Sequence, residues 1–222
     1  MFCNDSIIFR FRGPFGVPIE IGSSIILLAF IFVRPFGDTA HILENAIFFG
    51  LILLAIFLHE MGHAWATLIQ GHSVKRVMIY GGGGFCEGTR ALPRADEEFV
   101  VVMGPIVNLA LWALSSLAYP YAFQNNLPAL GSYLYWFADI NIFLFVLNMI
   151  PVQPLDGGKL LFLTFRRWMD RPRSIRLAGI IGLICAVAWI PAMIYCFIAL
   201  GFLLLFMPSI RMHWRMAKGK AG

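Results

Sequence analysis

The sequence predicts an all-α polytopic membrane protein with about six transmembrane helices, and three observations lead to this fold class. Of the 222 residues, 59% are hydrophobic and only 13% are charged, whereas a soluble domain carries roughly a quarter charged residues. The mean hydropathy is +0.78. Several apolar runs approach the length needed to cross a hydrocarbon layer of ~30 Å. Such long, uniform runs satisfy their backbone hydrogen bonds as helices rather than as barrel strands.

The expected spans are separated by residues that end helices. Gly71 suits the end of the second span, and Pro120 closes the third. The fourth is followed by prolines and glycines at 151–158, which cannot continue a regular helix, and then by a short amphipathic helix at 159–169. Pro191 divides the last apolar run in two. The six spans are therefore expected at residues 17–33, 45–69, 97–119 and 132–150, with two more within 174–210.

A segment of different character lies between the second and third spans. Residues 74–80 are rich in β-branched and aromatic side chains, and a run of four glycines follows at 81–84. This pattern predicts a short β-hairpin or strand at the membrane surface. The chain has no fixed-period repeat and no Ser/Gly-rich linker. We therefore expect one membrane-embedded domain over residues 1–222, with its core at 45–160.

The basic residues predict the orientation in the membrane. If six spans alternate in direction, sixteen of the seventeen Lys and Arg residues fall on one side and Arg34 alone falls on the other. The positive-inside rule makes the basic side cytoplasmic, with both termini there. The formal net charge of +5 is then a topology signal. We expect a multi-pass protein of the cell membrane with no nucleic-acid partner.

The strongest chemical signal is the HEMGH motif at residues 59–63, within the second span. Residues four apart lie on one helix face, so His59 and His63 can bind one zinc ion. Glu60 can accept a proton from water and pass it to a leaving amine. Ionisable groups inside a span are costly unless they serve a cavity or a partner. The alternative is a buried polar cluster that only ties helices together.

A catalytic zinc needs a third protein ligand and an open position. The acidic residues and histidines in or near the predicted spans are the candidates: Glu20, Asp139, Asp156, His41 and His72. His59 lies ~16 Å from the cytoplasmic end of its helix, and Asp156 follows a span that runs toward the same side. Irregular backbone at membrane depth is tolerated where it lines a cavity, which favours Asp156 and leaves Asp139 in reserve. The alternative role for Asp156 is an N-cap of the following helix.

Three motifs in order give the chain a resemblance to a known family. HEMGH at 59–63, GPIVN at 104–108, and NMIP at 148–151 leading to LDGG at 155–158 resemble the site-2 protease family of intramembrane zinc metalloproteases. The resemblance covers roughly residues 45–160. It implies one zinc ion per chain, held by His59, His63 and Asp156, with Glu60 as the catalytic base.

The resemblance also suggests roles for two asparagines and the glycine run. Asn108 and Asn148 are expected near the metal, where an amide donates to the substrate or to a developing oxyanion; an interhelical hydrogen bond is the equally open alternative. The glycines at 81–84 either align an unwound substrate by strand addition or form a flexible turn. Asp139 has no role that the sequence assigns, and His213 is expected at the surface.

The predicted activity is hydrolysis of peptide bonds within or beside transmembrane segments of membrane-anchored proteins. The resemblance implies regulated intramembrane proteolysis. Because no segment is long enough for a PDZ or CBS domain, we expect a regulatory membrane protein as a partner, besides the lipid bilayer and a transmembrane substrate. The alternatives are a membrane metal or ion transporter and a catalytically idle membrane scaffold. No inverted repeat of broken helices supports the transporter.

Overall fold

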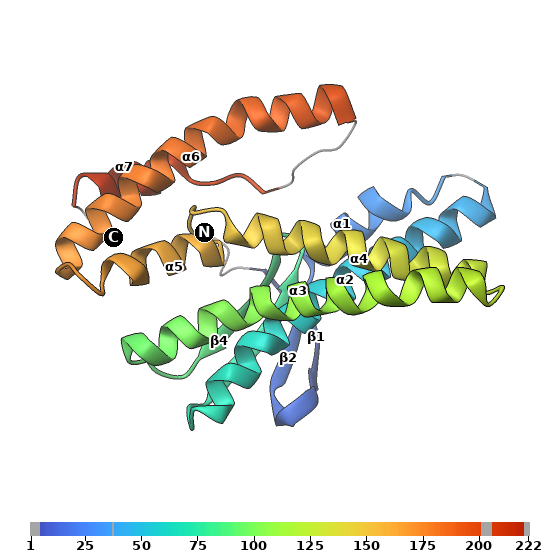
Figure 1. The fold of residues 1–222 in the computed structure, drawn as a ribbon, viewed down its shortest axis with the longest axis horizontal. Coiled ribbons are helices and arrows are strands. Elements are labelled where there is room, and N and C mark those ends of the chain that lie inside the picture. Colours follow the sequence, from blue (N-terminus) through green and yellow to red (C-terminus); the bar gives the residue numbers. More distant parts are fainter. Residues whose placement is uncertain (1–4, 37, 201–205, 220–222) are drawn as a thin grey trace. The chain divides into compact units, whose positions relative to one another are not determined.

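The computed structural model describes residues 5–36, 38–200 and 206–219 (Figure 1). The described chain is mostly helical with one small sheet, as the sequence predicts, and it divides into two compact units, Met1–Phe145 and Val146–Gly222. The elements follow in this order: β1 (Ile7–Arg12), a short 3-10 helix η1 (Pro14–Gly16), β2 (Pro18–Gly22), α1 (Ser24–Val33), α2 (Thr39–Ile69), β3 (Val74–Tyr80), β4 (Gly83–Gly88), α3 (Arg94–Gln124), α4 (Pro128–Met149), α5 (Asp156–Phe165), α6 (Arg171–Leu200) and α7 (Ile210–Ala217).

The sheet of the first unit has the strand order β1-β2-β3-β4. β2 runs parallel to β3, and the other two pairs are antiparallel. The hairpin of β3 and β4 lies where the sequence predicts it, between the second and third apolar runs. The buried face of the sheet packs on α2 through an apolar core of Val17, Ile19, Met61, Ala64, Val77 and Ile79. This core fixes the sheet against the part of α2 that carries the HEMGH motif.

The predicted first span is wrong in its N-terminal half. Pro18–Gly22 form β2, and the helix that follows, Ser24–Val33, has only 10 residues. Ile19, Glu20 and Ile21 alternate as a strand does, but β2 also pairs with β3, which comes from a distant part of the chain. At 1.5 Å per residue, α1 is about 15 Å long, half the thickness of a hydrocarbon core.

Four of the described helices are long and apolar enough to cross a membrane: α2, α3, α4 and residues Arg171–Tyr195 of α6. The expected count of about six is not confirmed. Pro120 and Pro191 were expected to end spans, yet each lies inside a helix, α3 and α6 respectively. A proline removes one backbone hydrogen bond, whereas ending the helix within an apolar run would expose several unsatisfied groups. Gly71 does follow the end of α2, with a φ of 78°.

Glu20, one of the candidate metal ligands, is instead committed to ion pairs across the sheet. Its carboxylate lies 2.6 Å from Arg10 Nη2 and 2.8 Å from Arg76 Nη1, and Arg76 Nε also pairs with Glu87 at 2.7 Å. Burial raises the pKa of Glu20, but the hydrogen bonds from Arg76 and Arg10 outweigh it and hold the pKa below its ordinary value of 4.5. The charged form of Glu20 therefore joins β1, β2 and β3.

We predict that Glu20→Gln lowers the Tm at pH 7 by about 2–4 °C, the shift that a loss of ~1 kcal/mol gives in a chain of this size. Because folding lowers the pKa of Glu20, its contribution is present above pH 4.5 and is lost as the pH falls through the folded value. The Tm difference measured in detergent across pH 3–7 therefore shrinks toward acid. Glu44→Gln, at a side chain that is 61% exposed, is the control and leaves the Tm unchanged.

Candidate metal centre

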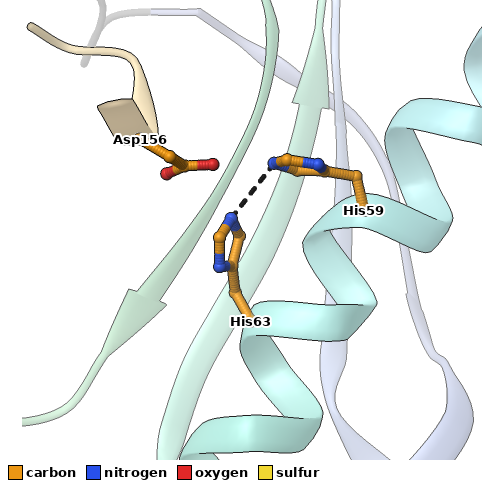
Figure 2. Close-up of side chains that lie close together, drawn as sticks. All are labelled: His59, His63 and Asp156. Atoms are coloured by element: carbon orange, nitrogen blue, oxygen red, sulfur yellow. Dashed lines mark hydrogen bonds between the residues drawn. The ribbon is translucent and has the colours of Figure 1, made fainter. Parts of the chain in front are cut away.

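His59 and His63 lie one turn apart on the same face of α2, and both are buried (Figure 2). Their rings meet nearly edge to face, at an interplanar angle of 85°. The two Nε2 atoms are 3.1 Å apart. The spacing of the motif therefore does bring the two imidazoles together, with the same nitrogen of each ring turned toward the other.

The other ring nitrogen of His63 faces a backbone carbonyl of α3. His63 Nδ1 lies 2.7 Å from Val100 O. A carbonyl oxygen only accepts, so Nδ1 carries the proton and donates it. In a neutral His63, Nε2 is then left with a lone pair.

A chain of amides fixes His59 in the same way. Asn141 Nδ2 donates to Phe137 O at 2.7 Å, so Asn141 Oδ1 faces Asn108 and accepts from its Nδ2 at 2.8 Å. Asn108 Oδ1 consequently faces His59 Nδ1 at 2.5 Å and accepts its proton. This order follows from the carbonyl of Phe137, which can only accept. His59 Nε2 therefore also presents a lone pair.

The two imidazoles held in this way turn their Nε2 atoms toward each other at 3.1 Å. For zinc bound at ~2.0–2.1 Å with tetrahedral angles, two nitrogen ligands lie about 3.3 Å apart, close to the spacing seen here. A second hydrogen bond on each ligating imidazole is the arrangement that orients metal-binding histidines. The pair fits a zinc site.

Two glycines let α2 and α3 approach closely at this point. A Cβ on Gly62 would lie 2.8 Å from Val107 Cγ2 and 2.9 Å from Met103 O, and a Cβ on Gly104 would lie 2.7 Å from His59 Nε2 and collide with the ring of His63. Larger residues would push the helices apart. The glycines of HEMGH and GPIVN thus have a packing role that brings Val100 and Asn108 within reach of the imidazoles.

Glu60 is buried and lies against the glycine-rich hairpin. A Cβ on Gly84 of β4 would lie 2.6 Å from Glu60 Cγ. Burial, and then the nearby charges of Glu60 and Asp5, raise the pKa of Tyr80 at the end of β3. Both observations put the Glu60 carboxylate beside the junction of β3 and β4. The run at 81–84 is therefore more than a flexible turn, since Gly84 leaves room for Glu60.

The other candidates for a third ligand, including the reserve Asp139, have other partners. Glu20 is ion-paired as described above. His72 Nε2 lies 2.7 Å from the Asp96 carboxylate, and His41 lies 3.8 Å from Glu44 at the surface. Asp139 is exposed on α4 and hydrogen-bonds Tyr135 one turn earlier. The contacts of these four side chains are made to other residues than the histidine pair.

Asp156 and Asn148 belong to the second unit. Asp156 is buried and is the first residue of α5, after Leu155 as N-cap, so it is not the N-cap that the alternative interpretation required. Figure 2 labels Asp156 together with His59 and His63 and shows the element that carries each one. Asn148 lies half-buried in the last turn of α4.

The sequence analysis missed the structural roles of two buried residues, Asn141 and His213. Asn141 was given no role, although an amide in an apolar helix needs a partner, and its partner is Asn108. His213 was expected at the surface, which is wrong, since only 1% of it is exposed. His213 is buried because α7 packs on α6, a contact that the local sequence does not indicate.

Comparisons with known proteins show which family this chain resembles. The family model for Peptidase family M50 matches residues 121–190. Stage IV sporulation protein FB of Bacillus subtilis is 34% identical over 136 residues, or 57% of this chain and 43% of that protein. Zinc metalloprotease MJ0392 of Methanocaldococcus jannaschii is 25% identical over 171 residues, or 75% of this chain and 48% of that protein. The chain thus spans less than half the length of these curated relatives.

The fold has a solved counterpart. The Site-2 Protease from Methanocaldococcus jannaschii matches with a TM-score of 0.61 and 19% identity, covering 96% of this chain and 93% of that one. The fold and the histidine pair define a multi-pass membrane protein of metalloprotease type. The chain carries a Peptidase family M50 (site-2 protease) domain, and the resemblance drawn from the three motifs is confirmed.

We predict that Asn108→Ala weakens zinc affinity about 10- to 100-fold, the usual cost of removing a partner that orients a ligating histidine. His59 would lose the acceptor that fixes its tautomer. Zinc bound by the purified protein, titrated with a competing chelator, measures the effect. Asn108→Asp keeps an oxygen toward His59 and retains more zinc than the alanine variant; equal losses in the two variants would contradict a role for this hydrogen bond.

Proposed function

We propose that this chain is an intramembrane zinc protease that hydrolyses peptide bonds within or beside transmembrane segments of membrane-anchored proteins. The observation that carries the proposal is the pair of imidazoles whose Nε2 atoms face each other at 3.1 Å on a helix long and apolar enough to span a membrane. Membership of the site-2 protease family supports the same chemistry.

The proposed metal ligands are His59, His63 and Asp156. All three side chains are buried within their own units, and an imidazole nitrogen or a carboxylate oxygen is a ligand that zinc accepts. Two neutral imidazoles and one carboxylate leave a fourth position open, which is the composition of catalytic rather than structural zinc sites. The relatives named zinc metalloproteases make zinc the expected ion.

In the proposed mechanism the protein supplies orientation and proton transfer. Zinc, when bound, supplies a Lewis acid that acidifies water and polarises a carbonyl group. Glu60 takes a proton from the attacking water and gives it to the leaving amine. Asn108 holds His59 through Nδ1 and so acts as a positioning residue, which leaves Asn148 as the candidate donor to the oxyanion.

The sheet offers a way to present the substrate. β4 is an edge strand, and its residue Gly84 lies against Glu60. A transmembrane helix has its backbone hydrogen bonds satisfied internally and must unwind before a peptide bond can be attacked. An unwound segment that pairs with the free edge of β4 would recover backbone hydrogen bonds and would run past Glu60.

The proposed setting is a single domain in the cell membrane, with both termini on the cytoplasmic side. Support for the orientation comes from the sheet, which carries Arg10, Arg12, Lys75 and Arg76 on β1 and β3, as the positive-inside rule requires of cytoplasmic segments. Regulated intramembrane proteolysis and a regulatory membrane partner remain part of the proposal.

We predict that Glu60→Gln retains zinc but loses cleavage of a transmembrane substrate by at least ~100-fold, because general-base catalysis typically contributes that much. Asp156→Ala loses zinc as well as cleavage. Metal analysis and gel-based cleavage in proteoliposomes measure both. If neither the natural protein nor Glu60→Gln cleaves the substrate, and both take metal into the vesicles equally, the result would favour the transporter. Zinc binding without cleavage or uptake would favour an idle scaffold.

We predict that Gly84→Ala slows cleavage about 10- to 100-fold, since small misplacement of a catalytic group has costs of this size. The added methyl group displaces the Glu60 side chain, whose Cγ lies 2.6 Å from the Cβ position, and leaves the zinc content unchanged. Gly88→Ala on the same strand is the matched control, because its Cβ meets nothing nearer than Arg90 O at 3.6 Å. Equal rates in the two variants would contradict the placement of Glu60.

A further inference from the structure

The segment that leads into Asp156 is packed tightly within the second unit. A Cβ on Gly157 would lie 2.5 Å from Ile150 O, and a Cβ on Gly158 would lie 2.5 Å from Gln153 N. Val152 is completely buried. The first turn of α5 therefore rests directly on the backbone of residues 150–153, and the position of Asp156 depends on where that backbone is held.

His213 of α7 holds this backbone from the other end of the second unit. Its Nε2 accepts a hydrogen bond from Gln153 N at 3.1 Å. Its Nδ1 donates to Ser209 O at 2.9 Å, and because a carbonyl only accepts, this contact leaves Nε2 free to be the acceptor. Both ring nitrogens of a side chain that is 1% exposed thus have defined partners.

The surrounding helices leave a fitted space for the ring. Gly182 of α6 has no room for a Cβ, which would collide with the imidazole of His213. Gly179, one turn earlier, is equally close to the backbone of Met216 and Ala217 in α7. Two glycines of α6 thus let α7 lie close against it, where His213 reaches Gln153. Figure 1 shows α7 beside α6.

A buried histidine can serve packing alone, but an apolar residue would pack equally well and would leave the Gln153 N–H without this acceptor. Losing the partner of a buried donor is costly. The imidazole is the feature of α7 that reaches the segment three residues before Asp156. The family match ends at residue 190, before α7 begins.

We propose that His213 is a positioning residue for the metal site: through Gln153 it fixes the backbone that carries Asp156, so that α7 controls how tightly the metal is held. This inference rests on the proposed function, in which Asp156 is a zinc ligand. It assigns to α7 a part in metal retention, although no residue of α7 touches the metal or the substrate in this role.

Two substitutions separate the two hydrogen bonds of the ring. In His213→Gln the side-chain oxygen can reach the position of Nε2 and still accept from Gln153 N. In His213→Asn the shorter amide can donate to Ser209 O but cannot reach Gln153. We expect the asparagine variant of the full chain to bind zinc about 10- to 100-fold more weakly in chelator competition, and the glutamine variant to bind within about threefold of the natural protein.

Met216→Ala is the control for helix packing, because Met216 is buried in α7 without contacting Gln153 through a hydrogen bond. It lowers the Tm and leaves zinc affinity unchanged. Equal zinc affinity in the asparagine and glutamine variants would overturn the inference, and so would a loss of zinc in Met216→Ala that follows its Tm. The expected result is a loss of zinc confined to His213→Asn.

Asp156→Ala, measured beside these variants, distinguishes a failure of the proposed ligand set from a failure of the positioning role of His213. If it retains zinc, Asp156 is not a ligand, and both the ligand set and the role of His213 are wrong. If it loses zinc while His213→Asn retains it, the ligand set stands and only the positioning role of His213 is overturned.

Discussion

The structure of the candidate site depends on two lone pairs being held face to face. Val100 O and, through two amides, Phe137 O can only accept hydrogen bonds, and they force the protons of both imidazoles onto Nδ1. The Nε2 atoms are left facing each other at 3.1 Å. Two imidazole nitrogens turned toward each other on one face of a helix are suited to bind a single metal ion.

Close contact between backbones makes this possible. Gly62 and Gly104 bring α2 and α3 together, and Gly84 brings the edge strand to Glu60. The space of the missing side chain is taken by Val107 and Met103 at Gly62, by the two imidazoles at Gly104, and by Glu60 at Gly84. These glycines are therefore explained by the space that they leave rather than by flexibility, and Gly104 and Gly84 leave it to candidate site residues.

The polar groups of this apolar chain are satisfied by one another. Glu20 pairs with Arg10 and Arg76 in the sheet, the asparagines of α3 and α4 pair with each other, and His213 joins α7 to Gln153. Each interaction links segments distant in sequence. A buried polar residue in such a chain marks a place where two elements meet, as Asn108 does between α2, α3 and α4.

The sequence by itself determined the helical membrane class, the hairpin after the second apolar run and the pairing of His59 with His63, because hydropathy and an i, i+4 spacing are local properties of the chain. Only the tertiary structure decided that residues 18–22 are a strand, that Asn108 and Asn141 fix a tautomer, and that His213 is buried. These outcomes depend on partners from other elements, since a strand edge or an amide acquires its role only from the group brought opposite to it.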